Sequence, residues 1–69
     1  MAWVAVNKDG SEFIFHDKPI RIEICGLNVF DTKPRSEGYY VELPKGTIKK
    51  LIGRELTWED EPVELNYEN

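Results

Sequence analysis

A chain of 69 residues, 41% of them hydrophobic and 12% aromatic, is too apolar to stay disordered and long enough for one core, so we expect a single small domain over residues 1–69. Its net charge of -4 argues against general nucleic-acid binding, which depends on neutralising phosphates with lysine and arginine. The single cysteine excludes an intrachain disulfide and a multi-cysteine metal site, and it suits a reducing cytoplasm.

The start of the chain predicts a β-hairpin. Residues 3–6 and 12–15 are rich in β-branched and aromatic residues, and the segment between them has turn chemistry. Asn7 suits the first position of a type I turn, and Gly10 supplies the positive φ of a following bulge. The apolar run before Asn7 is too short for a signal peptide or a bilayer span, so we expect a soluble cytoplasmic protein without membrane contact.

A third strand is expected over residues 20–24, where isoleucines alternate with charged residues at the period of a half-buried strand. A turn over residues 16–19 precedes it. Gly26 marks either a bulge or the end of this strand, after which the chain continues through residues 27–30 with a changed facing. The segment 31–38 has no apolar residue and predicts a loop.

Residues 39–43 predict a fourth strand, which Pro44 ends. Its alternation places Tyr39, Val41 and Leu43 on one face. We therefore expect Tyr39 to lie in the core.

A short amphipathic helix is expected next, from the i, i+3, i+4 spacing of Ile48, Leu51 and Ile52. Gly46 or Thr47 suits its N-cap and Gly53 its C-terminal end. A helix of about two turns is not stable alone, so its apolar stripe must dock on the sheet. Lys49 and Lys50 would then face water.

The last part of the chain returns to β-like character. Residues 56–58 have the composition of a strand, residues 59–62 that of a charged turn, and residues 63–67 alternate as a last strand would. All these elements together predict an α+β fold, a small twisted antiparallel β-sheet of about four to six strands with one short amphipathic helix packed on it.

Several short motifs are spread along most of the chain. They are Trp3-Val4-Ala5, Lys8-Asp9-Gly10, Phe15 followed by Lys18-Pro19, Leu43-Pro44, and the run from Leu56 through Trp58-Glu59-Asp60-Glu61-Pro62 to Leu65. In these motifs the sequence resembles a group of very small proteins of bacteriophages and mobile elements of gut bacteria. The resemblance implies a phage or mobile-element setting and brings no biochemical activity with it. The sequence departs from the group in carrying Asn7 where an acidic residue is expected, which removes support for a cation site at the first turn.

No segment combines the residues that catalysis or metal binding requires. The turn at Gly10 lacks the acidic first and last ligands of an EF-hand loop, because Ala5 and His16 occupy those positions. His16 and Cys25 are formally a nucleophilic pair, but nothing in their spacing shows that they meet, and a cysteine is usually a small buried residue. Two ligands are too few for a zinc site. We therefore expect no catalytic residue, no metal and no cofactor.

Two weaker patterns could serve phosphate or nucleic acid. Lys45-Gly46-Thr47 precedes the helix but lacks the long glycine-rich loop of a P-loop, so an ordinary helix start is the favoured interpretation. Tyr39 and Tyr40 precede a group of lysines, as in single-strand binders. With Tyr39 assigned to the core, nucleic acid is not the expected partner.

Charge is segregated along the chain, because residues 1–44 sum to -2, residues 45–54 to +4 and residues 55–69 to -6, which together give -4. Tryptophan anchors many interfaces, and neighbouring carboxylates steer basic partners. The candidate partner surface is Trp58, Glu59, Asp60, Glu61, Lys49 and Lys50. In the alternative interpretation Trp58 closes the core and the acidic residues only solubilise a turn.

These observations favour a non-enzymatic accessory protein of a phage or mobile element that binds a host or phage protein. The alternative is an acidic inhibitor that mimics nucleic acid and occupies the basic groove of a host enzyme. It requires one extended acidic face that lysine and arginine do not interrupt. Exposed sheet edges could also pair two copies into a homodimer.

Overall fold

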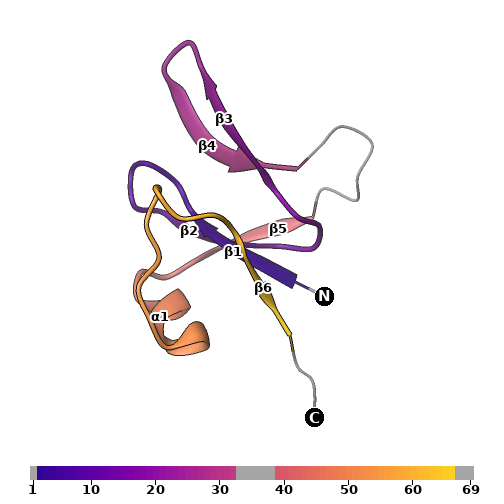
Figure 1. The fold of residues 1–69 in the computed structure, drawn as a ribbon, viewed down its shortest axis with the longest axis vertical. Helices are drawn as coiled ribbons and strands as arrows, with labels where there is room; N and C mark the ends of the chain where they lie inside the picture. Colours follow the sequence, from indigo (N-terminus) through magenta and orange to yellow (C-terminus); the bar gives the residue numbers. More distant parts are fainter. Residues whose placement is uncertain (1, 33–38, 67–69) are drawn as a thin grey trace.

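The computed structural model describes residues 2–32 and 39–66, which form two antiparallel sheets and one helix. Four strands form the larger sheet in the order β5-β2-β1-β6: β1 (Ala2–Val6), β2 (Glu12–Phe15), β5 (Tyr40–Leu43) and β6 (Val63–Leu65). β3 (Ile20–Ile24) pairs only with β4 (Leu27–Asp31), and in Figure 1 this hairpin and the helix α1 (Thr47–Ile52) lie on different sides of the larger sheet. The α+β class predicted from the sequence is confirmed, with the strands divided between two sheets.

The β1–β2 turn has the geometry predicted from its residues. The N–H of Gly10 donates to the carbonyl of Asn7 at 2.9 Å, and Gly10 has a φ of 91°. The N–H of Asn7 donates to the carbonyl of Ser11, also at 2.9 Å. A type I turn followed by a glycine bulge therefore joins the two strands and fixes the pairing of Val6 with Glu12.

Both faces of the larger sheet are covered. One face carries a cluster that includes α1: Val4, Val6, Ile48, Leu56 and Leu65. The opposite face packs on the β3–β4 hairpin through Ala5, Phe15 and Phe30. Successive residues of β1 alternate between these two clusters, so the central strand is buried on both sides.

The helix α1 lies between two glycines. Gly46 is its N-cap, with a φ of 94°, and Gly53 ends it with a φ of 82° and an N–H that donates to the carbonyl of Lys49. The predicted helix is thus confirmed, with Gly46 as the cap. Ile48 is fully buried, whereas Leu51 is 45% exposed, so the expectation that Leu51 docks on the sheet was wrong. A helix this short lays only one turn on the sheet.

The β3–β4 connection decides between the two interpretations of Gly26, because β3 ends here and no bulge is present. Cys25 and Gly26 both have positive φ, 53° and 81°, and Ile24 pairs with Leu27 across them. They form a two-residue hairpin turn of type I′, so the chain reverses instead of continuing through a bulge. Cys25 is exposed, contrary to expectation, because it lies at the tip of a hairpin.

The facing of β3 also differs from expectation. Arg21 pairs with Phe30 on the side turned toward the larger sheet, and the isoleucines lie on the outer side, where Ile20 is 37% and Ile24 is 65% exposed. The alternation gave the correct period and the wrong face. The period of a strand does not tell which side is covered, and here aromatic rings cover the arginine.

Three further expectations need correction. Tyr39 is 68% exposed and does not lie in the core, because β5 is an edge strand that α1 is too short to cover. Residues 56–58 form no strand. Asp31 ends β4, so the expected loop begins later, and its residues 33–38 lie outside the described residues, as does Tyr67 of the expected last strand.

Candidate functional site

Trp58 is held between the β3–β4 hairpin and the larger sheet. Its ring centroid lies 5.1 Å from that of Phe30 in an edge-to-face arrangement. The guanidinium carbon of Arg21 lies 4.8 Å from the Trp58 ring centroid and 5.1 Å from that of Phe30. Trp58 is half-buried, so much of this side chain serves packing, which leaves a partner only part of its surface.

The acidic turn after Trp58 is fastened to β3. The Asp60 carboxylate accepts from the Thr57 backbone N–H at 2.8 Å and from its hydroxyl at 3.2 Å, which closes the turn. Arg21 Nη2 donates to the Asp60 carbonyl at 3.1 Å and to Glu61 Oε2 at 3.4 Å. Glu59 and Glu61 remain exposed. The turn therefore presents carboxylates beside the hairpin in a fixed position.

The two lysines of the predicted surface lie elsewhere. Lys49 and Lys50 belong to α1, which covers the opposite face of the larger sheet from the ring of Trp58. Lys49 Nζ is 3.9 Å from Glu55 Oε2, and both side chains are exposed. The six predicted residues thus fall into two groups, the acidic turn with Trp58 around Arg21 and the lysines on the helix.

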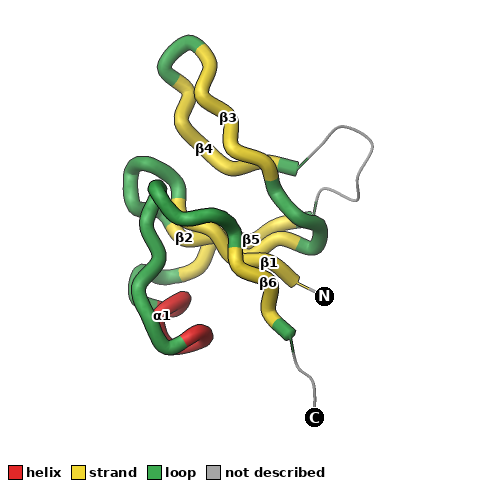
Figure 2. Tube along the Cα trace, viewed as in Figure 1, coloured by secondary structure: helices red, strands yellow, loops and turns green. Residues whose placement is uncertain are grey.

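The segment between α1 and β6 links these two groups. Figure 2 shows it as a loop that leaves α1, reaches the level of the β1–β2 turn and returns to β6. Leu56 enters the cluster on the helix side, and Trp58 enters the aromatic cluster on the other side. The loop therefore passes over one end of the larger sheet and closes both clusters.

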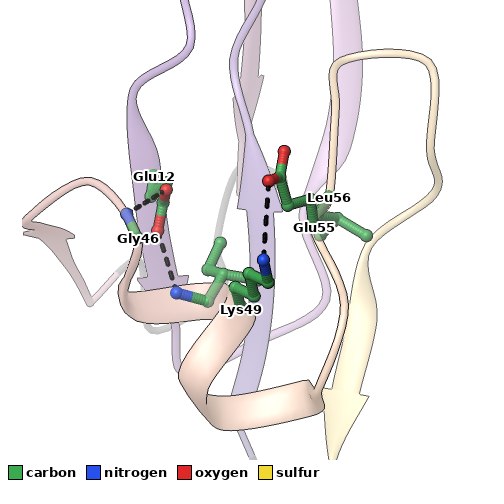
Figure 3. Close-up of a pocket in the computed structure, with 6 residues that line it drawn as sticks. Glu12, Gly46, Lys49, Glu55 and Leu56 are labelled. Carbon is green, nitrogen blue, oxygen red and sulfur yellow. Dashed lines mark hydrogen bonds and ion pairs between the residues drawn. The ribbon is translucent and has the colours of Figure 1, made fainter.

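A cavity of about 200 Å³ lies beneath this loop at the start of α1. Figure 3 shows its polar groups directed at one another: Glu12 points from β2 to the first turn of α1, and Lys49 points to Glu55. Glu12 accepts from the N–H of Gly46 at 2.7 Å and from that of Ile48 at 2.9 Å. The hydrogen bonds of Glu12 join α1 to the sheet, and Lys49 pairs with Glu55. The polar groups that line the cavity therefore already have partners within the protein.

A wider cleft of about 420 Å³ separates the β1–β2 turn from residues 55–59. Both signs of charge line it, because Lys8 and Glu12 lie on one side and Glu55 and Glu59 on the other. Elsewhere Arg21 pairs with Glu61. Basic side chains thus lie beside some of the acidic residues of this segment.

His16 and Cys25 are not brought together. His16 is exposed, with Nδ1 3.0 Å from Asp17 Oδ1, and it precedes β3, whereas Cys25 follows β3 directly. The length of β3 therefore separates them, roughly 16 Å at about 3.3 Å per residue. Within residues 2–32 and 39–66, no group of three or more His, Cys, Asp or Glu side chains is placed to hold a metal ion.

The exposed apolar surface is the feature that the sequence interpretation missed. Ile24 and Leu27, which pair across the hairpin turn, are 65% and 52% exposed. A second exposed group, Tyr39, Tyr40 and Val41, lies along β5. A signal was present in the sequence, because reading Cys25-Gly26 as a two-residue turn places the isoleucines of β3 opposite Leu27 and Val29 in one apolar row.

No protein-family model matches the chain, and comparisons with curated proteins and with solved structures give no match either. In the part of the chain that the structure describes, no helix has the length and apolar character needed to cross a membrane.

Proposed function

We propose that this protein is a non-enzymatic binding protein that acts through contact with another protein, using the outer face of the β3–β4 hairpin. One observation carries the proposal. Ile20, Ile24 and Leu27 are all more than one third exposed and share this face. Large aliphatic side chains gathered on an exposed surface mark interaction sites.

The hairpin is held firmly enough to act as a rigid binding element. A two-stranded hairpin alone is marginal in water, so its inner face must supply the stability. Phe30 is 5% exposed in the aromatic cluster, and Arg21 stacks on it and on Trp58. Because the outer face is presented by a fixed element, little conformational entropy is lost on binding.

The surroundings of the hairpin indicate the chemistry of the partner. The acidic turn lies beside β3, because Arg21 binds both the Asp60 carbonyl and Glu61, whose side chain is 83% exposed. A partner that matches this surface has an apolar groove for the isoleucines and basic side chains at its rim. In this proposal the apolar outer face of the hairpin forms the centre of the interface. The carboxylates of the acidic turn contact the partner at its rim.

The biological setting is part of the same proposal. The resemblance of the sequence motifs supports a phage or mobile-element protein that binds a host or phage protein. The exposed thiol of Cys25 supports a reducing compartment, the cytoplasm, because exposed free thiols are readily oxidised elsewhere.

The thiol of Cys25 allows a photo-cross-linker to be attached to the hairpin, which tests the proposed binding surface. Cys25 is the only cysteine of the chain and lies next to Ile24, so a photo-cross-linker attached to its thiol samples contacts of the outer face. We expect a specific cross-linked product in bacterial lysate, lost in the Ile24→Ser, Leu27→Ser variant. The Glu59→Lys, Glu61→Lys variant should weaken it by about tenfold, because rim charges steer association.

Matched controls decide between this surface and others. The same probe on a Cys25→Ser, Lys50→Cys variant samples α1 on the opposite face of the sheet and should not give this product. Unchanged circular dichroism would show that the serine variant is folded, as expected for two exposed side chains. A product that survives the serine substitutions, or no specific product at all, would overturn the proposal.

A further inference from the structure

At the β5 edge of the larger sheet, alternate residues have backbone groups that bind no other described residue. The His16 N–H donates to the Tyr39 carbonyl at 2.9 Å, and the ladder continues with Ile14 opposite Val41. Hydrogen-bonded and non-hydrogen-bonded pairs alternate in an antiparallel ladder. The backbone groups of Val41 therefore face β2, and the N–H and C=O groups of Tyr40 and Glu42 point away from the sheet.

The other edges are protected. On β4, the Asn28 carbonyl accepts from Lys8 N–H at 3.4 Å and the Phe30 N–H donates to Asn7 Oδ1 at 2.9 Å. β6 has three residues and directly follows Pro62. On β3, the residues whose backbone groups point away from β4 are Arg21 and Glu23, which have charged side chains. β5 contains no lysine and no proline, the usual devices against edge pairing.

The side chains of β5 are complementary to themselves. We infer that β5 pairs antiparallel with β5 of a second copy about a two-fold axis at Val41, which makes one eight-stranded sheet from two four-stranded ones. In this register the two Val41 side chains meet, and Tyr39 lies opposite Leu43 of the second copy on the same face. On the other face Tyr40 lies opposite Glu42, where a phenol can donate to a carboxylate.

The exposed area of the β5 side chains indicates how large the dimer interface can be. Tyr39 is 68%, Val41 62% and Tyr40 56% exposed. At about 200 Å² for each tyrosine side chain, the two tyrosines offer on the order of 250 Å² per copy, well below the roughly 800 Å² per partner of a standard interface. The dimer is therefore a weak one that dissociates on dilution.

The net charge of the protein makes the proposed dimer dependent on salt concentration. Each copy carries -4, so long-range repulsion opposes the pairing, and added salt strengthens it by screening. The contact is independent of the proposed function, because it uses β5 and leaves the outer face of the β3–β4 hairpin free. Each proposal can therefore fail without the other.

Sedimentation equilibrium on the full chain tests the pairing. From about 10 µM to about 1 mM, the average mass should rise from that of one chain toward that of two. Val41→Lys should lower the association constant by about tenfold or more, because two like charges then meet across the axis. This substitution reduces the net negative charge, so a general charge effect would act in the opposite direction. Glu23→Lys makes a charge change of the same sign away from β5 and should not weaken association.

Two further variants test the edge and the register. Glu42→Pro removes an N–H that faces the open edge, so it should abolish the dimer and leave the ladder with β2 intact. In a Cys25→Ser background, Val41→Cys should form an intermolecular disulfide with oxygen as oxidant at least about fivefold faster than Tyr40→Cys, because only the side chains at position 41 meet on the axis within disulfide reach. A monomer at about 1 mM, a dimer unaffected by Val41→Lys and Glu42→Pro, or equal cross-linking at both positions would overturn the inference.

Discussion

The carboxylate of Glu12 on β2 and the backbone N–H of Ile48 in α1 are joined by a hydrogen bond of 2.9 Å. The other oxygen of the same carboxylate accepts from the Gly46 N–H at 2.7 Å. Gly46, the N-cap, has no side chain to accept a hydrogen bond, so a strand residue distant in sequence caps the helix. This contact fixes α1 to the sheet.

Removing that cap should destabilise the protein. Glu12→Ala leaves a part-buried N–H without its acceptor, and we expect the free energy of unfolding to fall by about 1–2 kcal/mol. Glu12→Gln keeps one acceptor oxygen and should cost about half as much. Urea unfolding followed by tryptophan fluorescence measures both. Glu23→Ala, on an exposed glutamate of β3, is the control; an equal loss there would contradict the capping role.

Asn7 should be the second sensitive polar residue. The residue is 9% exposed, and its Oδ1 accepts from the Phe30 N–H, which fastens β4 to the β1–β2 turn. Asn7→Ala should lower the free energy of unfolding by about 2 kcal/mol and remove the exchange protection of the Phe30 amide. Asn7→Asp retains the acceptor and should keep that protection. A Phe30 amide that stays protected in Asn7→Ala would disprove the role of this bond.

The two kinds of contact made by Arg21 should differ in weight. Its ion pair with Glu61 is solvent-exposed, so Glu61→Gln should change the free energy of unfolding by less than about 0.5 kcal/mol. Arg21→Lys loses the planar stacking on Phe30 and Trp58 and should cost about 1–2 kcal/mol with a change in the near-ultraviolet circular dichroism. Equal losses in the two variants would assign the stability to the ion pair.

Cys25 adopts a φ of 53°, which a side chain of its kind rarely takes. Type I′ turns favour Asn-Gly, so Cys25→Asn should raise the free energy of unfolding by about 0.5–1 kcal/mol. Cys25→Val should lower it, because a branched Cβ is strained in this conformation. Thermal unfolding under reducing conditions compares the three proteins, and a less stable asparagine variant would contradict the turn assignment.

The pKa of Asp9 should lie below its ordinary value of 3.8. The backbone N–H of Ser11 donates to its carboxylate at 2.9 Å, and the Ser11 hydroxyl and Lys45 act in the same direction. Because the folded pKa is the lower one, the ionised carboxylate stabilises the fold above pH 3.8, and this contribution is lost as the pH falls through the folded value.

A carboxyl titration by nuclear magnetic resonance measures the Asp9 value directly. Asp9→Asn should remove this part of the acid dependence of stability while the β1–β2 turn remains. A midpoint at or above 3.8 would contradict the hydrogen-bond assignment.

Local chemistry predicted the elements that depend on neighbours in sequence. Gly10 predicted the first turn and Gly53 the end of α1, because a positive φ favours glycine at such positions, and Gly46 was one of two residues expected to cap its start. The facing of β3 was beyond this kind of inference. Which side of an alternating strand is buried depends on what packs against it, and the rings that cover Arg21 include Trp58, from a distant part of the chain.

For the predicted partner surface, too, the features set by neighbouring residues were predicted correctly and those set by distant residues were not. Asp60 and Glu61 do form a turn beside Trp58, because the Thr57–Asp60 bonds are local. Their separation from Lys49 follows from the route of the chain over the end of the sheet, which neighbouring residues do not encode. The exposure of Tyr39 and Val41 was missed because the alternation of this strand is the same whether or not another element covers it.

The place of β1 between β2 and β6 governs how a nascent chain completes its fold. β2 follows β1 closely and can pair with it early, whereas β6 and the loop residues Leu56 and Trp58 belong to the last part of the described chain to be synthesised. Closing such a long loop is slow compared with forming a hairpin. Until residues 56–65 leave the ribosome, both clusters around β1 stay open, and their apolar side chains are exposed to aggregation.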